Sequence, residues 1–135
     1  MKELEITERE SDGVTILEIK GEVDIYSGEA LKDRLGGLAG CQNLLLNIAG
    51  IDYIDSFGLS LLISYRKKMG KEGRKLGLCC PQSYVKRILN LTKLYDFLAV
   101  YDDEDAAIES FLKGDGQIKL QMEPKVSSLS DERRA

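Results

Sequence analysis

A serine hydroxyl at the predicted start of a helix is the group in this chain best placed to do chemistry. The apolar run 44–48 predicts a buried strand, the segment from Asp52 to Asp55 a short acidic turn, and the pattern over 59–70 a helix. Ser56 therefore lies where unpaired N–H groups and the helix dipole create partial positive charge. A phosphate there would meet a site suited to an anion and would add roughly −1.5 to −2 charges. This placement suits a phosphorylation switch.

The same residues also have an ordinary structural interpretation. Ser and Asp are common N-caps because their oxygens accept hydrogen bonds from the first turn of a helix. Gly58 would allow close packing where the strand turns into the helix, because it has no Cβ. Spacing alone favours a simple cap at Asp55 or Ser56, so the residues by themselves leave both interpretations open.

Most catalytic chemistry is excluded by what the chain lacks. It has no histidine, which rules out Ser-His-Asp and Cys-His hydrolases and histidine-ligated metals. The glycine-rich stretches 36–40 and 70–75 lack the G-K-[ST] ending of a phosphate-binding loop, so a partner kinase would have to supply the phosphoryl donor. Asp52 and Asp55 are spaced as a strand-end turn and a helix cap rather than as an acid–base pair. We therefore expect no enzyme activity, no cofactor and no metal site.

Three stretches, in the right order, resemble the bacterial anti-sigma factor antagonists of the STAS domain family. The segment Asp55-Ser56-Phe57-Gly58-Leu59 resembles their D-S-x-G-L signature. The segment 21–35 resembles their G-x-[LV]-D…A-x-x-L stretch, and 81–94 resembles their third helix and the turn after it. The resemblance extends over residues 4–113.

The resemblance implies both a mechanism and a surface. The unmodified protein would bind a cognate anti-sigma factor, often a serine kinase, and free the sigma factor. That kinase would phosphorylate Ser56 and so block binding, and a metal-dependent serine phosphatase would reverse the modification. The partner-binding residues expected around Ser56 are Asp24, Tyr26, Asp55, Phe57 and Gly58. Phe57 departs from the small residue that many relatives carry, which leaves the identity of the partner open.

An alternative keeps the fold and drops the switch. STAS domains also serve as non-phosphorylated adaptors, for example in lipid-transport complexes or stress-signalling assemblies. Ser56 would then be only a cap, and Ser56→Ala would cost about 1 kcal/mol of stability and no function.

Composition fits one small domain that binds neither nucleic acid nor membrane. The 135 residues are 43% hydrophobic, enough for one core, and 19 basic against 23 acidic residues give a net charge of −4. We expect no direct nucleic-acid binding, no membrane insertion and a cytoplasmic location, because neither a signal peptide nor a run of about 20 apolar residues is present. The basic residues over 66–75 are interpreted as a solvated helix end. Cys41, Cys79 and Cys80 are expected to be buried structural thiols, with the adjacent pair on opposite faces of a strand.

The order of elements predicts an α/β fold: a mixed sheet of four to five strands with about four helices packed against it. Strands are expected at 4–6, 14–21, 44–48, 76–80 and 98–101, with a turn at Ser11-Asp12-Gly13. Helices are expected after Ser27, from Ser56 to Gly70, after Pro81 and over 102–112. Residues 1–113 would form the domain and 114–135 a polar, flexible tail, in which the alternation of Ile118, Leu120 and Met122 leaves a short added strand open.

Overall fold

The computed structural model describes residues 4–113, which form one five-stranded mixed sheet with four helices, as predicted. The strands lie in the order β1-β2-β3-β4-β5; β1 is antiparallel to β2 and the other neighbours are parallel. Their bounds are β1 Glu5–Ser11, β2 Val14–Val23, β3 Asn43–Ile54, β4 Lys75–Cys79 and β5 Val100–Tyr101. The alternation at 118–122 lies outside the described residues.

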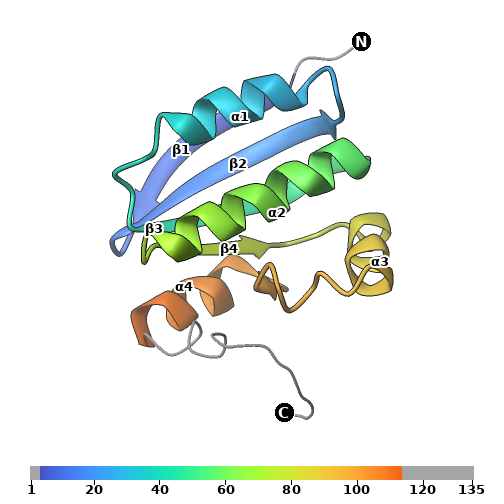
Figure 1. Ribbon diagram of the computed structural model, residues 1–135. Helices are drawn as coiled ribbons and strands as arrows, with labels where there is room; N and C mark the ends of the chain where they lie inside the picture. The colour runs from blue at the N-terminus through green and yellow to red at the C-terminus, as the bar shows by residue number, and fades with distance from the viewer. Residues whose placement is uncertain (1–3, 114–135) are drawn as a thin grey trace.

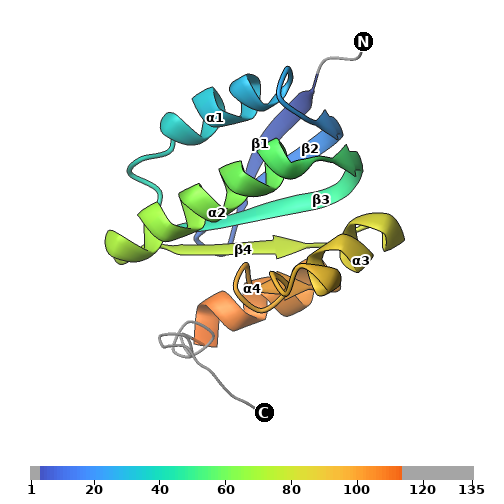
Figure 2. The same cartoon turned by 45° about the vertical axis from the view of Figure 1, so that its right-hand side comes forward.

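The helices cover both faces of the sheet (Figure 1, Figure 2). They are α1 Gly28–Gly36, α2 Ser56–Lys71, α3 Ser83–Leu91 and α4 Glu104–Lys113. Leu44 and Leu46 of β3 share a core with α1, α2 and α3, whereas Leu45 packs with Ala107 of α4. The central strand is therefore buried on both faces, as its apolar sequence predicts. None of the helices in this part of the chain is long and apolar enough to cross a membrane.

The predicted turn between the first two strands is a two-residue hairpin loop. Ser11 pairs with Val14, and between them Asp12 and Gly13 have φ values of 53° and 80°. Positive φ at both central residues is the type I′ geometry, which suits the twist of paired strands. Asp and Gly are residues that tolerate this backbone.

Two strands are longer than predicted, and this changes the setting of Ser56. β2 continues past Gly21 to Val23, and β3 continues to Ile54, which makes the expected acidic turn part of the strand. Register shifts after Glu18 and after Gly21 let the two strands remain paired beyond these irregularities. The helix therefore follows the strand with only one residue between them.

The helix that begins at Ser56 ends at Lys71, one residue beyond the predicted Gly70. Gly73, with φ 73°, occupies the left-handed position that closes the helix. The Arg74 N–H donates to the Met69 carbonyl at 2.8 Å, and the Gly73 N–H donates to the Gly70 carbonyl at 3.1 Å. This is a Schellman closure, so Gly73 is the residue that ends the helix.

Arg74 is not part of a solvated basic end, because its side chain is buried (8% exposed). Its guanidinium donates to the Cys41 carbonyl at 2.7 Å and to the Leu38 carbonyl at 2.8 Å, and pairs with Glu72 at 2.6 Å. Arg66 of the same predicted cluster also has a structural contact, since it stacks on Phe97 at 5.4 Å. The interpretation of these two cations as solvated was wrong, because their partners are distant in sequence.

We expect Arg74→Lys to lower the free energy of unfolding by about 1.5 kcal/mol, because a lysine ammonium cannot reproduce the planar fork that satisfies two loop carbonyls. Urea denaturation measures this loss.

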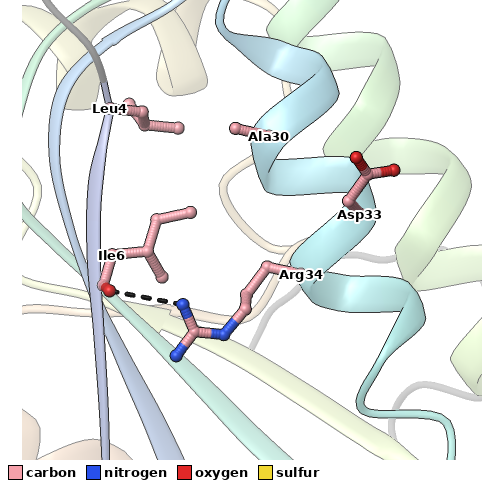
Figure 3. A pocket seen from close by; sticks show the side chains of 5 residues that line it. All are labelled: Leu4, Ile6, Ala30, Asp33 and Arg34. Carbon is pink, nitrogen blue, oxygen red and sulfur yellow. Dashed lines mark hydrogen bonds between the residues drawn. The ribbon is translucent and has the colours of Figure 1, made fainter.

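Arg34→Lys is the matched control. Arg34 spans a pocket between β1 and α1 lined by Leu4, Ile6, Ala30 and Asp33, and its side chain is 39% exposed (Figure 3). Its contacts with the Ile6 carbonyl and with Glu8, at 3.3 and 3.4 Å, are long. Equal losses in the two variants would contradict this account.

The cysteine prediction was wrong in its geometry. Cys79 is buried, but Cys41 and Cys80 are only partly buried. Cys80 lies just beyond β4 with φ 64°, so strand alternation stops before it, and it packs against the same cluster as Cys79. Burial raises the pKa of the Cys79 thiol, which makes it a poor nucleophile at neutral pH.

Candidate functional site

The candidate site lies at the carboxyl edge of the sheet, where β2, β3 and β4 end at Val23, Ile54 and Cys79. Because these strands are parallel, the helices that follow them begin at the same edge. Figure 1 shows the starts of α1 and α2 together with α3 at this end of the molecule. In open α/β sheets this edge is where ligands bind.

Ser56 is the first residue of α2 and is exposed. The cap is Asp55: its Oδ1 accepts the Gly58 N–H at 3.0 Å, and its own N–H donates to the Val23 carbonyl at 3.2 Å. None of the hydrogen bonds within residues 4–113 uses the Ser56 hydroxyl. Asp55 is therefore the cap at the start of the helix, and the exposed Ser56 is not needed for that role.

Gly58, one of the expected partner-binding residues, lies beneath the surface. A Cβ at this position would be 2.7 Å from Ile54 Cγ1 and 2.8 Å from the Val23 carbonyl oxygen. The absence of a side chain is what lets the first turn of α2 sit directly on the ends of β2 and β3. Gly58 therefore positions Ser56 and presents no side chain of its own.

Phe57 is partly buried, and its ring lies against the start of α1. A Cβ on Gly28 would be only 2.5 Å from Phe57 Cε2, so the ring occupies the space that the glycine leaves. The side chain beside the phosphorylation candidate thus connects α2 to α1, and only part of it can reach a partner.

Asp24 shapes the loop between β2 and α1. Its Oδ1 accepts the N–H groups of Tyr26 and Ser27, each at 2.9 Å, and these hydrogen bonds, the Ser27 N–H foremost, hold the pKa of Asp24 below its ordinary value. Ser27 stands at the predicted N-cap position, but its hydroxyl donates back to the Glu22 carbonyl and does not cap the helix. The resulting turn exposes Tyr26 (73%) and Ile25 (57%), of which sequence reasoning found only the tyrosine.

A pair of exposed aromatic side chains, Tyr53 and Tyr84, was also missed. The rings of Tyr53 and Tyr84 lie 6.4 Å apart, centroid to centroid, with 13° between their planes. Sequence reasoning placed Tyr53 in an acidic turn and Tyr84 in a separate helix. A weak signal existed, because a tyrosine next to the buried Ile54 has to point away from that isoleucine's face of the strand.

Comparison with known protein families shows to which family the chain belongs. The sequence model of the STAS domain family matches residues 5–107, most of the chain. This chain belongs to the STAS domain family.

Relatives of this STAS domain carry a common name. An anti-sigma F factor antagonist from Paenibacillus polymyxa is 24% identical over 108 residues, which cover 78% of this chain and 92% of the relative. An anti-sigma factor antagonist of known structure from Mycobacterium paratuberculosis is 24% identical, with a TM-score of 0.72 over 79% of this chain and 92% of that chain. The anti-sigma factor antagonist SpoIIAA, solved in its unphosphorylated form, is 15% identical, with a TM-score of 0.66 over 82% and 97%. The last two show a shared fold.

The carboxylates of this STAS domain are engaged by protein groups. Asp52 Oδ1 lies 3.4 Å from Gln82 Nε2, and Asp55 is the helix cap. Within residues 4–113 no group of three or more His, Cys, Asp or Glu side chains could hold a metal ion. Both carboxylates therefore contact other groups of the protein.

The Asp24 hydrogen bonds predict a pH dependence of stability. A carboxyl whose pKa is lowered in the folded state stabilises the fold above its unfolded value, about 3.9, and this contribution is lost as the pH falls through the lower folded value. We expect Asp24→Asn to flatten the decline in urea midpoint below about pH 4. An acid limb identical to that of the wild type would contradict this, and Asp33→Asn, at an exposed position of α1, is the control.

Proposed function

We propose that this STAS domain is an anti-sigma factor antagonist controlled by phosphorylation of Ser56. The unmodified form binds a cognate anti-sigma factor that is also a serine kinase, and so frees the sigma factor. The kinase transfers the γ-phosphoryl group of ATP to Ser56 Oγ, and a metal-dependent serine phosphatase removes it as inorganic phosphate. The observation that carries the proposal is an exposed serine at the start of α2 whose hydroxyl makes no hydrogen bond to any other residue in the range 4–113.

The surroundings of Ser56 support a binding surface. Ile25 and Tyr26 are exposed on the neighbouring loop, and exposed apolar and aromatic side chains at one edge are typical of protein contacts. The names of the relatives support the same general role, since several are called anti-sigma factor antagonists.

Phosphorylation would act locally. A phosphate dianion inside an interface has to be desolvated, and here it would lie close to the carboxylate of Asp55 and across the edge from Asp24. Affinity would fall without any refolding. The fold is compatible with such a state, because SpoIIAA, which shares it, has also been solved in a phosphorylated form.

The binding surface is tested by calorimetric titration of the purified anti-sigma factor with Tyr26→Ala and with Leu112→Ala. Leu112 is 62% exposed at the end of α4, on the other face of the sheet. We expect Tyr26→Ala to weaken binding by about ten-fold or more and Leu112→Ala to leave it unchanged, as for a central aromatic contact and a remote apolar one. Similar affinities for both variants would remove this edge from the interface.

A further inference from the structure

The stacked tyrosines at the carboxyl edge leave their ring faces open. Tyr53 comes from the end of β3 and Tyr84 from the first turn of α3, and the side chains are 41% and 40% exposed. Two nearly parallel rings whose centroids lie 6.4 Å apart are either displaced sideways or spaced apart, since a tight stack needs a much shorter distance. In both arrangements part of a ring face stays available to another group.

Gln82 joins the two elements that carry the tyrosine rings. Gln82, which immediately precedes α3, donates to the Ala49 carbonyl of β3 at 2.8 Å and lies 3.4 Å from Asp52. The start of α3, which carries Tyr84, is thereby fixed to the second half of β3, which carries Tyr53. A fixed aromatic pair costs little ordering when a ligand binds.

Acidic side chains flank the pair. Glu22 of β2 is the register partner of Tyr53, which places the two side chains on the same face of the sheet. Asp52 lies 3.4 Å from Gln82, which is two residues before Tyr84. Both acids are exposed, and within residues 4–113 no ion pair uses either of them. Of the basic residues on α3, Lys86 is paired with Asp102 at 3.2 Å, and Arg87 makes no ion pair or ring contact with this group.

The combination of open ring faces and nearby carboxylates complements a flat cation. A guanidinium stacks on aromatic rings and donates in its own plane to carboxylates, whereas a lysine ammonium is a compact and more strongly hydrated charge. We propose that Tyr53 and Tyr84, with Glu22 and Asp52, bind an arginine side chain of the protein partner. The identification of that partner rests on the proposed function. Tyr53 is three residues from Ser56, so the Cα atoms of the two residues are about 10 Å apart at most.

The test is a two-dimensional NMR titration of the full-length protein with N-acetyl-arginine amide, compared with N-acetyl-lysine amide. We expect saturable shifts confined to Glu22, Tyr53, Tyr84 and their neighbours, with binding of lysine at least about three-fold weaker. The shifts should disappear in Tyr84→Leu, which keeps apolar packing but removes the ring, and should weaken in Glu22→Gln. Leu112→Ala, at the exposed end of α4, should leave them unchanged.

Three results would overturn the proposal: no saturable shifts, shifts spread evenly over the acidic surface, or arginine binding that survives in Tyr84→Leu with its spectrum otherwise folded. The titration uses neither the anti-sigma factor nor the kinase, so its failure would leave the proposed function standing. If the protein bound arginine but did not bind the anti-sigma factor, the arginine site would stand and the proposed function would fail.

Discussion

Phosphorylation of Ser56 is expected to weaken binding of the anti-sigma factor by roughly 100-fold, which corresponds to about 2.7 kcal/mol. The phosphate would enter an interface beside the carboxylates of Asp24 and Asp55, where it would lose hydration and meet like charge. The fold should remain intact, because the Ser56 hydroxyl makes no hydrogen bond that phosphorylation would break within the described residues.

Calorimetry on four forms of the protein measures this effect: unmodified, phosphorylated, Ser56→Ala and Ser56→Asp. Ser56→Ala should bind like the unmodified protein and lose less than about 0.5 kcal/mol of stability, since Asp55 provides the cap. Ser56→Asp should bind less tightly, though its single charge is smaller than that of a phosphate. Wild-type affinity in both variants, or a large change in circular dichroism on phosphorylation, would contradict this local mechanism.

Gly58→Ala is expected to lower the free energy of unfolding by about 3 kcal/mol, because an added Cβ would overlap the Val23 carbonyl oxygen and the Ile54 side chain. The better helix propensity of alanine offsets only about 1 kcal/mol of this cost. The backbone oxygen cannot move aside without disturbing the paired ends of β2 and β3. Chemical denaturation measures the loss, and binding of the anti-sigma factor should weaken with it as Ser56 is displaced.

Gly70→Ala in the same helix is the matched control. The nearest atom to its added Cβ is a guanidinium nitrogen of Arg66, at 3.0 Å, which is the end of a side chain and not backbone. Here the gain in helix propensity, up to about 1 kcal/mol, should exceed the small cost of moving the arginine. Equal destabilisation of the two variants would mean that the packing of α2 on the sheet does not explain Gly58.

Local signals in the sequence were enough for the order of elements. The Asp12-Gly13 turn and the apolar run at 44–48 predict a hairpin and a central strand, because backbone preference and hydrophobicity act within a few residues. The ends of β2 and β3 were not predictable in this way. They depend on how two strands far apart in the chain remain paired across bulges, which no single segment records.

The candidate site was predictable only in part, for the same reason. The sequence located Asp55 and Ser56 at the start of a helix, but only the geometry shows which of the two is the cap. The local sequence predicted a solvated cation at Arg74, because the carbonyls to which Arg74 donates belong to a loop more than 30 residues away. The stacking of Tyr53 on Tyr84 likewise joins positions 31 residues apart, and no local pattern predicts it.

The central claim, that Ser56 is a phosphorylation switch, is tested most directly by intact-protein mass. Wild type and Ser56→Ala would be incubated with Mg-ATP and a lysate of the cells that produce the protein, in the presence of a phosphatase inhibitor. We expect a single added phosphate on the wild type and none on the variant. An unmodified wild type, or a phosphate that persists in Ser56→Ala, would contradict the claim; the first result would favour an unswitched STAS adaptor.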